Sequence, residues 1–260
     1  MRNTGICMRL KVTRTEKNEM NTGMKDRPVP RGYRVPVLVY HSVGDVFYND
    51  PVYSMHPADL EEHIVHLKNL GYTYITMDDL PELEQIKKPV IMTFDDGYAD
   101  NYDNLFPLLK KQEAKAVVSV ICGEIGAKGR LTEQQIREMS DSGLVSVQSH
   151  TMSHQALDTM SKDQLEYELG ESKRRIGWIT GKEPAAICYP MGRCSESVIL
   201  CAKKYYSYGI AGEGTCFVTG RNPYEIKRLF MYRGITAKEL GDCISWYESA
   251  TEDETELTEV

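Results

Sequence analysis

The sequence predicts an α/β protein in which parallel strands close into a barrel. Short apolar runs rich in β-branched residues alternate with segments whose apolar residues recur at helical spacing, which is typical of βαβ units. Six or more such units follow one another in the chain, and this number favours a barrel over an open sheet. The length of 260 residues is also common for an α/β barrel that forms a single domain.

The folded domain is expected to begin near Val35. The preceding residues show no hydrophobic periodicity, and they end in a segment at 27–32 that contains two Pro and one Gly, which is typical of a linker. We therefore assign 1–34 to a basic, disordered extension and 35–248 to one folded domain. The acidic residues at 249–260 are assigned to a disordered tail.

In the first half of the domain, apolar runs mark the strands and helical spacing marks the helices. Leu60, Ile64 and Leu67 recur at helical spacing, and Gly71 is a natural helix end. The elements expected in this half are strands at 35–40, 72–76, 89–94 and 116–121, and helices at 57–70 and 101–112.

The second half continues the same alternation. Thr132, with Gln135 three residues later, has the spacing of a capping box and predicts the start of a helix. Gly181 is expected to end the longest helix of this half. The further elements expected are helices at 161–179 and 195–205, and strands at 145–148, 185–189 and 208–211.

Charge is spread unevenly along the chain. The net charge is −7, and residues 1–35 hold nine Lys or Arg against three Asp or Glu, so the other 225 residues carry −13 (−7 minus 6). An acidic body argues against nucleic acid or an anionic membrane surface as the main partner. The basic segment 1–35 could contact nucleic acid or a membrane surface, but its composition is more typical of a solvated, disordered extension.

The cysteine content and the hydropathy of the sequence indicate the cellular compartment of the protein. Seven scattered cysteines without a CxxC pair indicate reduced thiols and no disulfide framework. No run approaches 18 apolar residues, so no transmembrane helix is expected. The N-terminus also lacks the apolar region of a secretory signal, and the sequence by itself therefore indicates a cytoplasmic protein.

Two motifs with ionisable side chains follow predicted strands, where ligands gather in parallel α/β folds. Asp95 and Asp96 follow one strand, and His150 and His154 follow another. One carboxylate can bind a metal ion while its neighbour acts as a base, and two histidines at i and i+4 lie on one face of a helical turn. Each motif alone could be structural, as a turn or a helix cap. Together they favour a metal-dependent hydrolase.

The same motifs carry a family resemblance. Thr93–Gly97 and Ser149–His154 resemble the first two motifs of the polysaccharide deacetylases, carbohydrate esterase family 4, with a NodB-type homology domain. The resemblance covers about residues 35–248. It implies a distorted (β/α)7 barrel and a divalent metal, usually zinc, with nickel, cobalt or iron as alternatives.

The resemblance also implies roles for the individual residues of the two motifs. By position, Asp96, His150 and His154 would bind the metal, and Asp95 would be the general base.

The start of the domain narrows the resemblance. Val37–Val43 is similar to the Tyr-His signature of a subgroup that deacetylates partly β-1,6-linked poly-N-acetylglucosamine. Most family members take their acid histidine from a Leu-x-His motif near the C-terminus, but the last histidine here is His154. The subgroup therefore implies His41 as the general acid, and the alternative is a structural histidine at a strand end. Three further histidines are expected on a solvated face: His56, His63 and His66.

A third motif departs from the commonest family pattern. Cys188–Gly192 aligns with the Tyr-Pro-x-Gly form of the subgroup, and Cys188 stands where an arginine usually partners the base. Arg228 matches an arginine typical of the subgroup and is the candidate to orient Asp95. The competing interpretation is a surface arginine. By the family pattern the backbone N–H of Met191 would help to hold the oxyanion, and Cys188 is expected to be a buried thiol and no ligand.

The resemblance implies a metal-dependent N-deacetylase that releases acetate from a polysaccharide containing N-acetylglucosamine. The alternatives are a metal-dependent hydrolase of another acylated sugar or of a small amide, and a non-catalytic carbohydrate-binding protein. An N-acetylated glycan substrate would need aromatic contacts, for which Tyr98 and Tyr189 are candidates, although core packing explains most tyrosines. Family enzymes that act on such polymers generally lie in the cell envelope or outside the cell, in conflict with the missing export signal.

Overall fold

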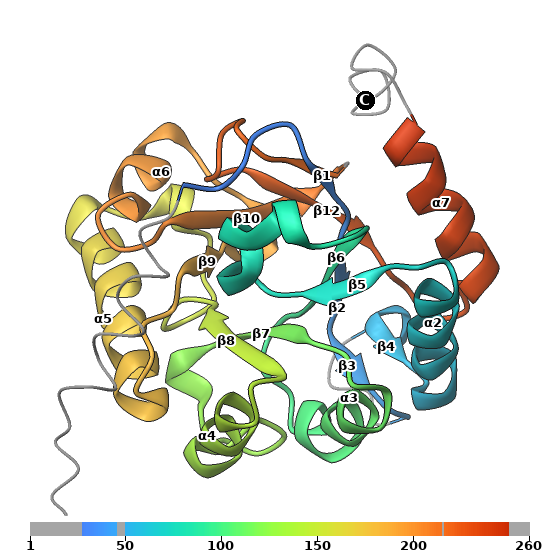
Figure 1. The fold of residues 1–260 in the computed structure, drawn as a ribbon. Helices are drawn as coiled ribbons and strands as arrows, with labels where there is room; N and C mark the ends of the chain where they lie inside the picture. Colours follow the sequence, from blue (N-terminus) through green and yellow to red (C-terminus); the bar gives the residue numbers. More distant parts are fainter. Residues whose placement is uncertain (1–27, 46–49, 215, 250–260) are drawn as a thin grey trace, which may run out of the picture.

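The computed structural model describes residues 28–45, 50–214 and 216–249 (Figure 1). The N-terminal extension and the acidic tail expected from the sequence therefore lie largely outside the described residues. Those of the extension that are described belong to the fold, because Gly32 and Tyr33 exchange backbone hydrogen bonds with Thr219.

The predicted barrel is confirmed. Within the described residues, seven parallel strands follow one another around it in the order β2-β12-β10-β9-β8-β7-β6, and β6 pairs back to β2, with β5 attached beside β6. The strands are β2 (Val37–Tyr40), β5 (Thr73–Ile75), β6 (Pro89–Phe94), β7 (Ala116–Val120), β8 (Val145–Ser149), β9 (Ala186–Cys188), β10 (Tyr208–Glu213) and β12 (Ile226–Phe230).

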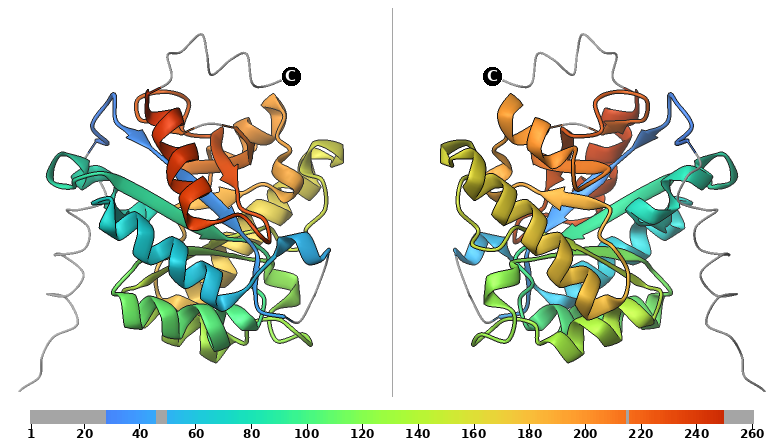
Figure 2. Two further views of the ribbon diagram at one scale, coloured as in Figure 1. Left: turned by 90° about the vertical axis from the view of Figure 1, so that its right-hand side faces the viewer. Right: turned by 90° about the vertical axis from the view of Figure 1, so that its left-hand side faces the viewer.

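Helices surround the barrel (Figures 1 and 2). The predicted capping box at Thr132 is present at the start of α4, and α5 begins with another at Ser161 and ends at Gly181 in the left-handed conformation. The helices are α2 (Pro57–Asn69), α3 (Phe106–Gln112), α4 (Glu133–Asp141), α5 (Lys162–Thr180), α6 (Glu196–Ala202) and α7 (Ala237–Ser249). None of these helices, nor any other in the described ranges, has the length and apolar character of a membrane span.

Short elements connect the larger ones. Two small sheets are formed by β1 (Arg34–Val35) with β11 (Phe217–Val218), and by β3 (Ser42–Val43) with β4 (Ser54–Met55). The short helical segments are η1 (Pro51–Tyr53), η2 (Met77–Gln85), the π-helix η3 (Asn101–Leu105), η4 (Cys122–Glu124), η5 (Leu157–Thr159) and η6 (Pro190–Gly192).

The strands place apolar and polar side chains at different levels inside the barrel. Alternate residues of a strand face the same side. On β6 the apolar Ile91 is followed on its face by Thr93 and then Asp95, and on β12 Ile226 is followed by Arg228. Ile91 and Ile226 belong to one buried apolar cluster, so on these two strands the inner face is apolar first and becomes polar towards the carboxyl end.

Candidate functional site

Asp95 and Arg228 form a buried ion pair at the carboxyl ends of β6 and β12. The guanidinium Nη1 lies 2.9 Å from Asp95 Oδ1 and Nη2 lies 2.8 Å from Oδ2, so both carboxylate oxygens accept a hydrogen bond. Asp95 is 3% exposed and Arg228 is 4% exposed, and the interpretation of Arg228 as a surface arginine is therefore wrong. Burial by itself raises the pKa of Asp95, but Arg228 and His150 outweigh it and hold that pKa at about 2.

Further polar groups fix the arginine and the carboxylate. Arg228 donates from Nε to the carbonyl of Ala211 at 3.1 Å and from Nη1 to Thr93 Oγ1 at 3.0 Å. The fully buried Cys188 thiol lies 3.4 Å from Asp95 Oδ2 and can donate to it. Cys188 is thus a buried thiol, as expected, but it also contacts the carboxylate.

Asp96, His150 and His154 form a group that could hold a metal ion. Asp96 Oδ1 lies 3.5 Å from His150 Nε2 and 3.4 Å from His154 Nε2. Within the described ranges of the chain this buried oxygen has no hydrogen-bond partner, although polar atoms removed from water are almost always bonded. Two imidazole nitrogens around an unpartnered carboxylate oxygen are the donor set of a divalent cation with open positions, so the residues fit a metal.

A backbone carbonyl on the side of the ring away from Asp96 fixes the orientation of the His150 imidazole. Its Nδ1 lies 2.8 Å from the backbone carbonyl oxygen of Cys188, which can only accept a hydrogen bond. Nδ1 therefore carries the proton, and the lone pair of Nε2 points towards Asp96. A carbonyl behind a histidine in this way is a common feature of metal sites.

The two histidines come together by a backbone different from the one expected. Residues 150–154 form no helical turn, and the chain adopts φ values of 67° at Thr151 and 56° at His154. The helical-turn argument is therefore wrong, although the two residues that it selected do meet. Their rings lie 4.7 Å apart.

A second group of donors is less suited to a cation. Asp95, His150 and the thiol of Cys188 also lie close enough to share an ion. Both oxygens of Asp95 already bind the guanidinium of Arg228, and a second positive charge there would be repelled. For the described residues, the ion pairs of the Asp96 carboxylate are with His150 and His154 and none is with an arginine or a lysine.

His41 lies at the carboxyl end of β2, on another side of the site. Its ring packs against Tyr53 and Phe230, and its buried Nδ1 has no hydrogen-bond partner in the part of the chain that the structure describes. Burial lowers the pKa of His41, whereas the charges of Asp95 and Asp96 raise it in opposition. The pKa of His41 is lowered overall, because burial together with the charges of Arg228 and His150 outweighs the two carboxylates.

Met191 presents its backbone at the end of β9, within η6. It adopts the left-handed conformation with φ of 56°, and its side chain is 57% exposed. The next residue must be glycine, because Gly192 has φ of 66° and a Cβ there would lie 2.2 Å from the Cα of Gly212. The close contact between Gly192 and Gly212 fixes the turn that carries Met191.

Strained backbone is concentrated at this end of the barrel. Six non-glycine residues in the described part of the chain have positive φ, and four belong to the site: Asp96, Thr151, His154 and Met191. Such conformations cost about 1–3 kcal/mol each and persist where the surrounding structure enforces them. For the β-branched Thr151 the conformation is a clear outlier.

Three expectations from the sequence need correction. Tyr98 is 3% exposed and lies over the guanidinium of Arg130, and Tyr189 is fully buried, so neither offers a ring face to a sugar. His63 does not lie on a solvated face either. It is 1% exposed, and its ring nitrogens contact the hydroxyl of Tyr40 and the carbonyl of Ile235.

Sequence reasoning did not single out Thr93, Phe230 or Tyr53 as site residues. Strand alternation could have identified Thr93 beside Asp95 and Phe230 beside Arg228, since each lies two residues away on the same face. No local signal identifies Tyr53, which reaches His41 through the β3–β4 pairing.

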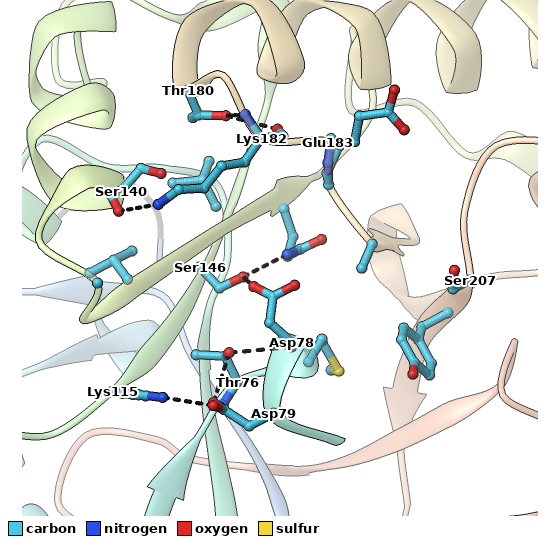
Figure 3. Close-up of a pocket in the computed structure, with 18 of the residues that line it drawn as sticks. Thr76, Asp78, Asp79, Lys115, Ser140, Ser146, Thr180, Lys182, Glu183 and Ser207 are labelled. Atoms are coloured by element: carbon cyan, nitrogen blue, oxygen red, sulfur yellow. Dashed lines mark hydrogen bonds and ion pairs between the residues drawn. The ribbon is translucent and has the colours of Figure 1, made fainter. Parts of the chain in front are cut away.

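A separate cavity of about 440 Å³ lies at the opposite end of the barrel, where β8, β9 and β10 begin (Figure 3). Its charged groups are largely paired with one another. Lys115 binds Asp79 at 2.7 Å, and Lys173 binds Glu183 at 3.1 Å. Ligands of such barrels bind at the carboxyl ends of the strands. The site around Asp95 is therefore the better candidate.

Known proteins resemble this chain over most of its length. A family model described as polysaccharide deacetylase matches residues 82–209. YxkH of Bacillus subtilis, which is assigned to the polysaccharide deacetylases, is 32% identical over 214 residues, which are 80% of this chain and 75% of that protein.

Two further relatives extend the comparison. The crystal structure of BC0361, a polysaccharide deacetylase from Bacillus cereus, superposes with a TM-score of 0.77 at 33% identity and covers 82% of this chain and 69% of that one. The poly-β-1,6-N-acetyl-D-glucosamine N-deacetylase of Staphylococcus aureus is 24% identical over 197 residues, 69% of this chain and 68% of that protein.

Proposed function

Because the chain belongs to the polysaccharide deacetylase family, we propose that it is a metal-dependent N-deacetylase of a glycan that contains N-acetylglucosamine. The observation that carries the proposal is one arrangement of side chains. A carboxylate held by a buried arginine, Asp95, lies next to a three-residue group that fits a metal ion, Asp96 with His150 and His154. Amide hydrolysis needs both an electrophilic centre and a base.

Asp96, His150 and His154 would hold the cation. Their donor set of two imidazoles and one carboxylate suits zinc, and nickel, cobalt or iron would also fit. When bound, such a cation supplies Lewis acidity, which polarises the acetyl carbonyl and makes water more acidic.

Asp95 would accept the proton of the attacking water. Arg228 keeps its carboxylate ionised and fixes its plane. Each carboxylate oxygen has two lone pairs. With the Cys188 thiol donating to Oδ2, Oδ1 accepts one bond from Arg228 and can still accept a proton or a hydrogen bond. In this assignment Arg228 orients the base and takes no part in proton transfer.

Two further groups complete the assignment. The backbone N–H of Met191 would donate to the oxyanion that forms at the acetyl carbon, and one such donor typically contributes about 3 kcal/mol to the transition state. His41 in its protonated form would donate to the amine nitrogen as the C–N bond breaks. The products are acetate and a free amino sugar.

Acetate release tests the function directly. The purified protein, loaded with zinc, would be incubated with poly-β-1,6-N-acetylglucosamine, chitooligosaccharides and acetylxylan, and the control is Asp95→Asn with the same zinc content. We expect release from an N-acetylated glycan, with poly-N-acetylglucosamine preferred because a relative acts on it. Release from acetylxylan alone, or equal rates for the wild type and Asp95→Asn, would contradict the proposal.

A further inference from the structure

His41 differs from His150 in how its ring is held. The Nδ1 of His150 is bonded to a backbone carbonyl, whereas the Nδ1 of His41 is buried and has no hydrogen-bond partner among the described residues. A proton donor must meet its acceptor at a defined distance and angle. Contacts other than a hydrogen bond at Nδ1 must therefore define the orientation of the His41 imidazole.

Two aromatic rings provide those contacts. The ring centroid of His41 lies 5.0 Å from that of Tyr53 and 5.7 Å from that of Phe230, with interplanar angles of 42° and 46°. Tyr53 and Phe230 also pack against each other, edge to face, with centroids 5.2 Å apart and an angle of 70°. Each separation is within the range of favourable aromatic contacts, so the three rings form a closed triangle.

Phe230 is placed by the strand that also places Arg228. The two residues are two apart on β12 and therefore face the same side of the barrel wall. Phe230 pairs with Val39 of β2, two residues before His41. One strand thus carries both the arginine that fixes Asp95 and a ring that contacts His41.

Tyr53 is placed by a segment that is itself tied to the barrel. Ser54, the next residue, donates from Oγ to the carbonyl of Gly44 at 2.6 Å. Arg233 donates from its backbone N–H to the carbonyl of Val52 at 2.8 Å and from Nη1 to the carbonyl of Ser54 at 3.1 Å. The backbone on both sides of Tyr53 is held, so its ring has a defined position.

We propose that Tyr53 and Phe230 are positioning residues that hold the His41 imidazole in line with the departing amine. This inference rests on the proposed function and on the acid role of His41. Both rings remain partly exposed, so they are not simply part of the core. Removing Tyr53 takes away one of the aromatic contacts of the imidazole, and the ring can then rotate away from its productive angle.

The test compares two leaving groups. Hydrolysis of the acetamide breaks the C–N bond, and the amine needs a proton from His41 to leave. Hydrolysis of 4-nitrophenyl acetate breaks a C–O bond, and 4-nitrophenolate leaves without a proton. We expect Tyr53→Ala to lower kcat for the N-acetylated glycan by about 10- to 100-fold while the aryl ester rate stays within about twofold of the wild type.

Three variants make the result specific. Tyr53→Phe keeps the ring and should restore most of the amide rate. Phe230→Leu should show the same separation of amide and ester rates as Tyr53→Ala. The matched control is Tyr167→Ala, which removes a 59% exposed tyrosine from α5 and should change neither rate. Thermal unfolding and zinc content would be measured for every variant.

The outcomes separate this inference from the proposed function. An equal loss of amide and ester hydrolysis in Tyr53→Ala would show a structural role and overturn the positioning role. An unchanged amide rate in a well-folded Tyr53→Ala protein would overturn the positioning role as well. A wild type that releases no acetate from any N-acetylated glycan would instead overturn the proposed function on which the inference rests.

Discussion

The buried pair of Asp95 and Arg228 makes a strong prediction for stability. Arg228→Met removes two hydrogen bonds to Asp95, and within the described residues only the thiol of Cys188 then remains on the oxygens of this 3% exposed carboxylate. Two buried hydrogen bonds to a charged group are worth about 1.5–3 kcal/mol each. Breaking a buried ion pair by removing one partner typically costs about 3–5 kcal/mol. We therefore expect a loss of about 3–5 kcal/mol in the free energy of unfolding.

The assay is urea denaturation at pH 7 in the presence of a chelator, so that no bound cation compensates for the lost charge. The pH matters because the pKa of Asp95 is lowered to about 2. A lowered pKa contributes stability that is fully present above the unfolded value of about 3.9 and is lost as the pH falls through about 2. At pH 7 the whole contribution of the pair is measured.

A double-mutant cycle provides the control. Asp95→Asn leaves Arg228 buried without its counter-charge and should cost a similar amount. The double variant removes both charges, so its loss should be smaller than the sum of the single losses by about 3 kcal/mol. Arg228→Lys keeps the charge but not the two-pronged geometry and should fall in between. Additive losses, or a loss below about 1 kcal/mol for Arg228→Met, would refute the reasoning.

Three further predictions concern His154 as a proposed metal ligand, the turn at Gly192 and His41 as the proposed general acid. His154→Ala should lower the zinc content measured by inductively coupled plasma mass spectrometry by at least about tenfold, because it removes one of three donors. Full zinc content would exclude His154 as a ligand. Gly192→Ala should lower the free energy of unfolding in urea by about 1–3 kcal/mol, since its Cβ would meet Gly212. An unchanged midpoint would contradict that clash. His41→Gln should lower amide hydrolysis by about 10²- to 10⁴-fold and spare 4-nitrophenyl acetate. If both rates fall together, His41 has another role.

Local patterns predicted most of the barrel because its strands and helices are short and strongly patterned. The capping box at Thr132 and the helix end at Gly181 depend on residues close in sequence, and both were predicted correctly. The strand β12 was not predicted, since Ile226–Phe230 contains Lys227 and Arg228 and does not resemble a buried strand. Its arginine is tolerated inside only because Asp95, 133 residues away, neutralises it.

The helix α7 was missed for a similar reason. Gly241 in its middle is unfavourable for an isolated helix. In the structure a Cβ at Gly241 would meet the imidazole of His66 on α2 at 2.6 Å, so glycine permits the close packing of the two helices (Figure 2). That packing partner is 175 residues away in the sequence and leaves no local signal.

At the candidate site, the sequence predicted which residues come together but not the backbone conformation that brings them there. Asp95, Asp96, His150 and His154 were selected by their place after strands, and the structure brings them together. The backbone that joins His150 to His154 could not be predicted, because positive φ at Thr151 opposes its own local preference and is imposed by tertiary contacts. The ring contact between Tyr53 and His41 likewise depends on β3 and β4.

Because β12 closes the barrel against β2, the barrel can be completed only late in the synthesis of the chain. Domains fold as the chain leaves the ribosome, with the N-terminal part available first. Asp95 emerges long before Arg228, so the nascent barrel holds a carboxylate with no counter-ion and an open edge between β10 and β2. A chain that stops before residue 226 would therefore lack both the last strand of the barrel and the guanidinium that holds Asp95. If the proposed function holds, activity should arise abruptly, only when the final strand is added.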